Sequence, residues 1–155
     1  MEKTLLLIKP DAIQRGLAGE IISRVEKKGL KITGMKMIQL TDKILTEHYS
    51  HISTKPFFGK IVEFMKSAPV IACCVEGLDA VDTLRNITGV TKSREAQPGT
   101  IRGDLGMSIQ ANLVHSSDSK EAAKDELNRF FASGDIFEYE HHLAPFIYST
   151  DERKA

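Results

Sequence analysis

Val70-Ile71-Ala72-Cys73-Cys74-Val75 is an unbroken apolar stretch that directly follows Pro69. A short apolar run of this kind indicates a strand covered on both faces, and such a strand lies near the centre of its sheet. The adjacent cysteines should point to opposite faces, so we expect no disulfide between them. The chain has two cysteines in all, too few for a zinc set, and buried free thiols fit a reducing cytosol.

The residues upstream of this strand predict a strand, a helix and a second strand. Thr4–Ile8 is a short apolar run, and residues 17–25 place apolar side chains at helical spacing before Gly29. Residues 30–37 alternate between apolar and polar, as in a half-buried strand. The alternation changes phase at Gly34, which predicts a β-bulge there.

Two short helices are expected before the apolar strand. Thr41-Asp42 can cap a helix that carries Leu45, Tyr49 and Ile52, and Pro56 would end it. A second helix holds apolar residues between 61 and 65.

The residues downstream predict a helix, a long loop, a strand and a last helix. The first helix spans Asp79–Thr88 and ends at Gly89, and residues 90–108 lack periodicity. The last strand is expected near residues 109–114. The resulting order, strand–helix–strand–strand–helix–strand, is that of a ferredoxin-like α+β (α/β) fold: a βαββαβ core with an antiparallel four-stranded sheet and added helices.

Composition limits the classes of function. The 155 residues suit one domain, 1–155, with a C-terminal tail from about residue 140. Hydrophobic residues are 41% and charged residues 27%, and 21 basic residues balance 21 acidic ones, so no basic field indicates nucleic acid. No apolar run has membrane-span length and no signal peptide is seen at Met1, so we expect a cytoplasmic protein that binds no membrane.

Asn112-Leu113-Val114-His115-Ser116-Ser117-Asp118-Ser119 is the stretch most suggestive of chemistry. It indicates a strand end, a histidine and a helix start, with Asp118 or Ser119 as N-cap. The N–H groups of a helix N-terminus favour an anion beside the imidazole, and neutral imidazole is a nucleophile. Taken alone, the pattern is also compatible with a structural histidine in a loop.

The same octapeptide resembles the active-site signature of nucleoside diphosphate kinases. Further stretches resemble that family in the family's order, over roughly residues 4–131: Lys9-Pro10-Asp11, His48-Tyr49, Lys55-Pro56-Phe57-Phe58, Arg85 with Thr91, and Pro98-Gly99-Thr100-Ile101-Arg102-Gly103-Asp104. The chain has neither G-x-x-x-x-G-K-[ST] nor G-x-G-x-x-G, so phosphate contacts must come from side chains.

The resemblance implies a role for each matched residue. His115 would accept the phosphoryl group as a phosphohistidine, and Glu126 would orient its imidazole directly or through Ser117. Tyr49 would reach His115 with its hydroxyl. The matched residues expected to bind the nucleotide are Lys9, Phe57, Arg85, Thr91, Arg102 and Asn112. A lysine and two arginines suit phosphate oxygens, and Phe57 offers a stacking face to any base.

The resemblance also implies an overall reaction and assembly. ATP or another nucleoside triphosphate would phosphorylate His115, and a nucleoside diphosphate would then take the phosphoryl group, in ping-pong kinetics. Mg²⁺ would accompany the nucleotide, with no metal site made by protein alone. A homo-oligomer, hexamer or tetramer, is expected.

Two positions depart from the family pattern, and two other functions stay open. Ser116 replaces the usual glycine, which would strain the backbone if φ had to be positive, and Leu105 replaces a common aromatic. An inactive relative acting as a binding or assembly protein is the main alternative. A ferredoxin-like RNA-binding module is the other, although its aromatic signature is absent from the expected strands.

Overall fold

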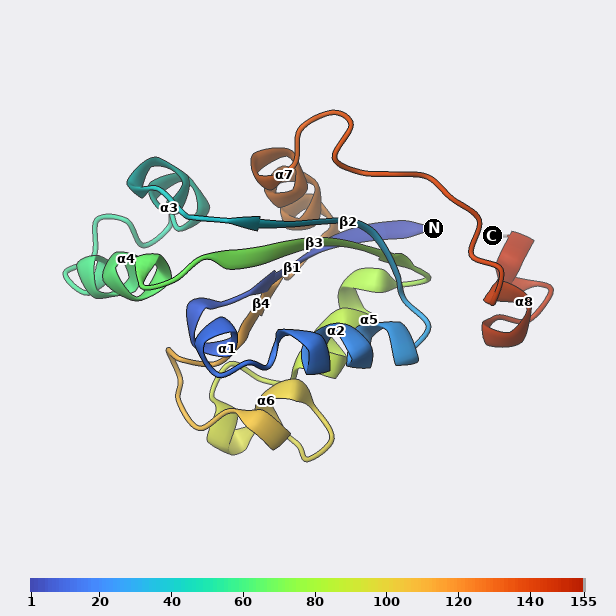
Figure 1. Ribbon diagram of the computed structural model, residues 1–155, viewed down its shortest axis with the longest axis horizontal. Helices are drawn as coiled ribbons and strands as arrows, with labels where there is room; N and C mark the ends of the chain where they lie inside the picture. Colours follow the sequence, from blue (N-terminus) through green and yellow to red (C-terminus); the bar gives the residue numbers. More distant parts are fainter. Residues whose placement is uncertain (155) are drawn as a thin grey trace.

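The computed structural model describes residues 1–154, and its centre is one antiparallel sheet (Figure 1). The strands are β1 (Glu2–Ile8), β2 (Lys31–Ile38), β3 (Val70–Gly77) and β4 (Val114–Ser116). Their order across the sheet is β2-β3-β1-β4, so β3 and β1 are central and β2 and β4 form the edges. The predicted ferredoxin-like fold and the central position of the apolar strand are confirmed.

Helices cover both faces of the sheet. One face carries α1 (Pro10–Gln14), α2 (Ala18–Lys27), α5 (Ala80–Thr88) and α6 (Ile101–Leu105). The other carries α3 (Asp42–His48) and α7 (Lys120–Phe130), with α4 (Phe58–Lys66) packed beside the sheet. Two cores result, one on each face.

Side-chain alternation along the central strands supplies both cores. Leu6 and Cys73 belong to the core under α2 and α5, whereas Leu5 and Cys74 belong to the core under α3, α4 and α7. Both cysteines are free and buried, as predicted, and burial raises the pKa of the Cys73 thiol to about 12. These thiols are therefore protonated packing groups.

Several features predicted from short sequence patterns, a β-bulge, helix N-caps and a helix end, are confirmed. The register of β2 against β3 shifts between Ile32 and Gly34, which confirms the bulge. Thr41 caps α3 by accepting a hydrogen bond from the Ile44 N–H, and Ser119 caps α7 by accepting from the Ala122 N–H. Gly29 follows α2 with φ of 99°, a conformation that glycine adopts without strain.

Three predicted boundaries are wrong. Helix α3 ends at His48, well before Pro56, and residues 49–57 are a series of turns. The supposed loop of residues 90–108 contains a 3₁₀ turn, η1 (Ser93–Glu95), and helix α6, which Thr100 caps by accepting from the Gly103 N–H. The last strand begins at Val114, because a tight turn at Leu113 separates it from residues 109–112.

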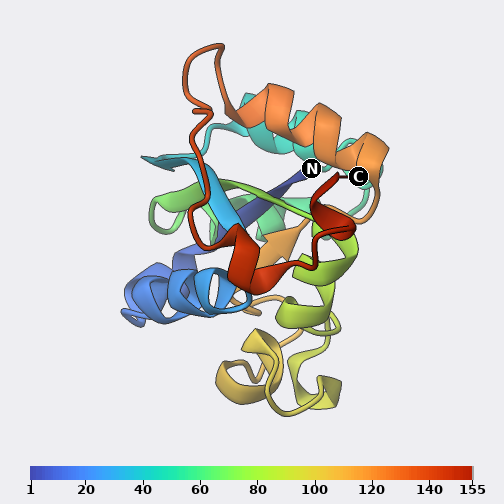
Figure 2. The same cartoon turned by 90° about the vertical axis from the view of Figure 1, so that its right-hand side faces the viewer.

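The C-terminal segment returns across the ends of the strands (Figure 2). It contains α8 (Ala144–Ile147) and η2 (Glu152–Lys154), and the Phe137 N–H donates to the carbonyl of Thr33 in β2. In the part of the chain that the structure describes, no helix has the length and apolar character needed to cross a bilayer.

Candidate active site

Edge strand β4 carries the predicted nucleophile, and the turn before it fixes the strand's direction. Leu113 has φ of 74°, and the Val114 N–H donates to the Asn112 carbonyl at 2.9 Å, which closes a γ-turn. The Asp11 carboxylate accepts the Leu113 N–H at 3.0 Å. This buried contact stabilises a backbone conformation that is strained for leucine.

His115 lies in the middle of β4 and is held from behind by helix α7. Its Nε2 lies 2.9 Å from Oε1 of Glu126, and the Ser117 hydroxyl donates to the other oxygen of that carboxylate at 2.6 Å. Burial alone would raise the pKa of Glu126, but the hydrogen bonds from His115 and Ser117 hold it below its usual range. The predicted direct contact of Glu126 with His115 is present, whereas Ser117 contacts the carboxylate and not the imidazole. Helix α7 begins at Lys120 with Ser119 as its N-cap, one of the two caps predicted.

His48 is a site residue whose role was not predicted from the sequence. Its ring packs edge-on against His115 with centroids 4.7 Å apart, and its Nδ1 lies 3.8 Å from Oε1 of Glu126. Burial and the neighbouring His115 lower the pKa of His48 to about 3, so this ring is neutral and makes no ion pair. The His48-Tyr49 motif was the available signal, but a histidine on an amphipathic helix is typical of core packing.

Lys9 stands at the end of β1, as predicted, and is tied to the turn before β4. Its ammonium group donates to Oδ1 of Asn112 at 2.7 Å. Burial, together with the nearby charge of Arg102, lowers the pKa of Lys9 to about 8. The Asn112 side chain also donates to the carbonyls of Thr91 and Ile109, both at 3.0 Å, so it connects three segments of the site.

Arg102 is the most firmly held cation of the site. It lies on α6 and is 7% exposed. Its guanidinium group donates to the carbonyls of Gly89 at 2.6 Å, Val114 at 2.7 Å and Asn112 at 3.2 Å. Burial and the nearby Arg85 lower its pKa to about 10, so the group is still charged at neutral pH. A guanidinium group has five N–H donors, so two remain for an anion.

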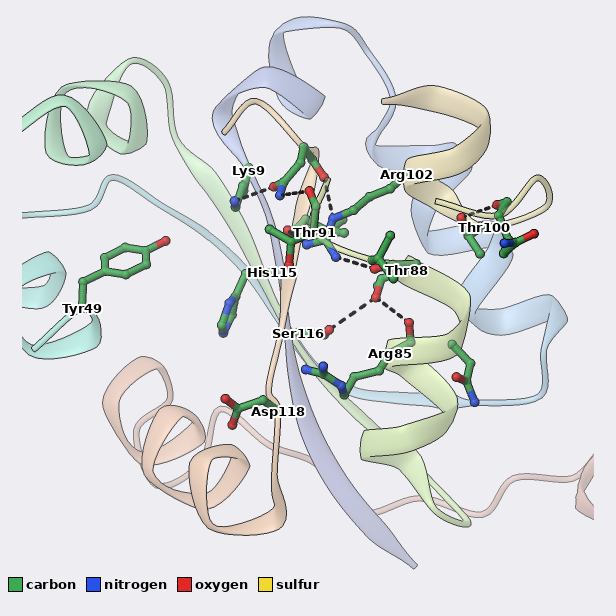
Figure 3. Close-up of a pocket in the computed structure, with 16 residues that line it drawn as sticks. Lys9, Tyr49, Arg85, Thr88, Thr91, Thr100, Arg102, His115, Ser116 and Asp118 are labelled. Carbon is green, nitrogen blue, oxygen red and sulfur yellow. Dashed lines mark hydrogen bonds between the residues drawn. The ribbon is translucent and has the colours of Figure 1, made fainter. Parts of the chain in front are cut away.

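These groups surround a cavity of about 540 Å³ at the free edge of β4 (Figure 3). The expected site residues in its wall are Lys9, Tyr49, Arg85, Thr91, Arg102, Asn112 and His115. Arg85 reaches it from the end of α5, and the Tyr49 side chain points into it from the opposite side. Burial raises the pKa of Tyr49 to about 12, so its hydroxyl is a proton donor at neutral pH. The wall is rich in cationic and donor groups, which suit phosphate oxygens.

A second, more apolar cavity of about 500 Å³ adjoins the first and shares Lys9, Tyr49, Thr91 and Asn112 with it. Phe57 and the side chains of α4 form one wall, and Ile109 contributes on the loop side. Phe57 is 50% exposed, as expected of a platform and not of a core residue. Ile109 was not singled out from the sequence, because one exposed isoleucine in a loop carries no pattern.

The structure therefore brings all of the expected site residues into one region. The polar cavity, the apolar cavity and the Ser117–Glu126 support behind His115 are contiguous. Together they form a surface that can hold a flat apolar ring at one end and a polyanion at the other, beside an oriented imidazole.

Comparison with known proteins identifies the same family that the sequence motifs resemble. The family model described as nucleoside diphosphate kinase matches residues 2–136. A relative of that name from Parabacteroides distasonis is 55% identical over 152 residues, covering 98% of this chain and 99% of the relative. Another from Staphylococcus haemolyticus is 51% identical over 148 residues, covering 96% and 99%.

Solved structures of similar proteins share the fold over nearly the whole chain. A halophilic nucleoside diphosphate kinase from Halobacterium salinarum, in complex with CDP, has a TM-score of 0.92 at 39% identity and covers 95% of this chain and 98% of its own. The Encephalitozoon cuniculi enzyme has a TM-score of 0.91 at 40% identity, covering 96% and 100%.

Proposed function

The chain belongs to the nucleoside diphosphate kinase family and is a phosphotransferase that acts on nucleotides, and we propose that it works by a ping-pong mechanism through His115. The observation that carries this proposal is the pairing of His115 Nε2 with the Glu126 carboxylate beside a cationic cavity. An inactive relative is not favoured, because the expected polar residues are all present at one site.

The nucleophile is Nδ1 of His115. The ionised Glu126 carboxylate is an acceptor, so the proton of the neutral imidazole resides on Nε2 and the lone pair on Nδ1. Attack by Nδ1 on the γ-phosphorus forms the P–N bond while the bond to the β-phosphate oxygen breaks, and that oxygen takes the electron pair. The nucleoside diphosphate leaves, and a second one reverses the step. Glu126 stabilises the positive charge that the ring gains.

Lys9, Arg85 and Arg102 offset the charge on the transferring group and on the leaving diphosphate. Thr91 contributes a hydroxyl at the same cavity, and Asn112 orients Lys9 through their hydrogen bond. Phe57 and Ile109 would hold the base in the apolar cavity. Stacking depends little on the identity of the base, so broad acceptance of ADP, GDP, CDP, UDP and dTDP is expected.

Mg²⁺ would enter with the nucleotide and would offset part of the charge of its phosphates. Among the described residues, Asp118 is the carboxylate in the wall of the polar cavity, which is otherwise cationic or neutral, so the nucleotide's own oxygens would hold most of the ion. His48, His115 and Glu126 have ligand atoms within 4.8 Å of one another, but their nitrogen donors do not suit Mg²⁺.

We propose a homo-oligomer, hexamer or tetramer, built from a single domain of residues 1–155 with its tail from about 140. Edge strand β2 supports a subunit contact, because its Met35 and Met37 are 57% and 59% exposed. The free buried thiols of Cys73 and Cys74 support a cytoplasmic location. No nucleic-acid or membrane partner is required.

Phosphorylation with γ-labelled ATP tests the proposal. The parent should form an acid-labile, base-stable phosphoprotein that any nucleoside diphosphate discharges, and His115→Ala should take no label. His142→Ala is the matched control, because that histidine's side chain is 83% exposed and lies outside both cavities. Labelling of His115→Ala at the parental rate would show that another residue is the acceptor.

A further inference from the structure

Ser116 is a cavity residue that the proposed mechanism leaves unused. It follows His115 on β4, so its side chain points to the opposite face of the strand, toward α5. It is 9% exposed, and it lines the polar cavity together with Thr88 (Figure 3). The cavity extends around the free edge of β4 and is therefore bounded by both side chains.

The Ser116 hydroxyl has one weak hydrogen bond within the described residues. Its Oγ lies 3.4 Å from Oγ1 of Thr88, whereas hydrogen bonds between hydroxyl groups are usually close to 2.7–2.8 Å. Thr88 donates its own proton to the Arg85 carbonyl at 2.9 Å. Ser116 must therefore be the donor in the long contact. Its hydroxyl proton thus has only a weak acceptor, although the side chain is nearly buried.

The surrounding charges define what this hydroxyl can bind. Lys9, Arg85 and Arg102 line the same cavity, so an anion is the ligand that it favours. A hydrogen bond from a hydroxyl to a charged oxygen is shorter and stronger than one to a neutral hydroxyl. Rotation of the Ser116 hydroxyl away from Thr88 thus exchanges a weak bond for a strong one.

We propose that Ser116 is a phosphate-binding residue whose hydroxyl turns from Thr88 to donate to a non-bridging phosphate oxygen of the nucleotide. The inference rests on the proposed function, since it takes the phosphates to occupy the polar cavity. Thr88 holds the hydroxyl in place while the cavity contains no nucleotide, and its own bond to the Arg85 carbonyl is retained after the exchange.

The backbone permits this side chain at no cost. Within residues 1–154, the non-glycine residues with positive φ are Asp79 and Leu113. Ser116 therefore has negative φ, and the backbone strain that a positive φ would cause is absent. A serine where the family usually has glycine therefore adds a donor to the site without a conformational penalty.

Calorimetry on the full chain can separate a phosphate contact from a packing role. The ligands are a β,γ-methylene ATP analogue, which cannot transfer its phosphoryl group, and adenosine, which has no phosphate. Ser116→Ala and Ser116→Gly should weaken binding of the analogue about tenfold, since a hydrogen bond to a charged acceptor is lost, and leave adenosine unchanged. Ser93→Ala is the matched control, because Ser93 is a buried serine outside the polar cavity whose hydroxyl lacks a partner among the described residues.

Three other outcomes would contradict the inference that Ser116 binds phosphate. Parental affinity of both Ser116 variants for the analogue would overturn the inference while leaving the proposed function intact. Equal weakening for the analogue and adenosine, with a lower melting temperature, would assign Ser116 to packing and also overturn it. Failure of the parent itself to bind the analogue would instead contradict the proposed site and the inference with it.

Discussion

Two groups of residues meet at this site, and they differ in how they are held. The anchored group is Lys9, Arg102, Asn112, His115 and Glu126, each of which has at least one hydrogen bond to another part of the site. The open group is Phe57, Arg85 and Thr91, which are exposed and whose side chains have no hydrogen bonds within the described residues.

The anchored side chains are held in position before the nucleotide binds, whereas the open side chains can adjust to it. Groups that face the transferring phosphoryl group must be in position before the reaction, because any reorganisation adds to the barrier. Groups that grip the base and the outer phosphates can be ordered by the ligand itself, at a cost in affinity. Loss of a side chain from the anchored group should therefore affect both the fold and the rate. Loss of one from the open group should affect nucleotide affinity and activity with little effect on the fold.

The two arginines give the largest contrast. Arg102→Ala should weaken nucleotide binding and slow transfer, together a loss of about 2–4 kcal/mol of transition-state stabilisation. It should also lower the free energy of unfolding by on the order of 3 kcal/mol, because three backbone carbonyls lose a buried donor. Arg85→Ala should reduce activity similarly and leave unfolding unchanged. Single-turnover phosphorylation beside urea denaturation measures both, and equal stability losses would remove the distinction.

Glu126→Gln should slow phosphoryl transfer without weakening nucleotide binding. The amide cannot hold the Nε2 proton as the carboxylate does, so phosphorylation should slow about 10–100-fold while affinity for a non-transferable ATP analogue is kept. The paired control is Glu121→Gln, an exposed glutamate on the same helix. A parental phosphorylation rate in Glu126→Gln would show that the anchored group includes a residue without a role in transfer.

The pKa of Lys9 predicts a moderate pH effect. Since burial lowers that pKa to about 8, the free enzyme should lose this charge as pH rises above 8, and kcat/KM should fall by up to about tenfold per pH unit. Lys9→Arg keeps the charge, so it should remove this limb of the profile even if its overall rate is lower. A parental profile that stays flat to pH 9.5 would exclude a requirement for protonated Lys9.

The lowered pKa of Lys9 has the opposite effect on folding stability, which should rise with pH where activity falls. Between pH 8 and the ordinary lysine value of 10.5, the unfolded chain binds more protons at this position than the folded chain. The contribution of Lys9 to folding stability therefore improves as pH rises through that range, while activity declines. Urea denaturation at two pH values within the range measures this contribution.

Phe57 should give the smallest effect. Phe57→Leu keeps an apolar contact but loses the flat face, so nucleotide affinity should fall by about 1 kcal/mol, roughly fivefold, for all bases alike. The free energy of unfolding should not change, because the ring is half exposed. Titration of ADP, GDP and CDP would check this, and a loss confined to one base would mean that Phe57 discriminates between bases.

The sequence predicted the parts of the molecule that depend on local patterns. The apolar run at residues 70–75, the phase slip at Gly34 and the cap at Thr41 each report a short-range preference, and each was confirmed. The predicted site residues depended on the resemblance to a family, since a lone lysine or arginine has no pattern of its own.

The wrong boundaries depend on contacts between distant residues. Residues 109–112 look like a strand, but the turn at Leu113 is held by Asp11, about a hundred residues away in the chain. Helix α6 has glycine in its interior, so its helical signal is weak, and Arg102 fastens it through three carbonyls of other segments. Such contacts cannot be read from periodicity.

The pairing of β1 with β4 places Leu6 opposite Ser116, and this pairing determines when the folding chain becomes active. Contacts that span most of a chain close the largest loops and form late in folding. During synthesis, the first strand has no partner on this side until residues 114–116 emerge, and Glu126 follows later still. Catalytic competence therefore arises only when the first strand has paired with the last, so recovery of activity during refolding measures completion of the fold.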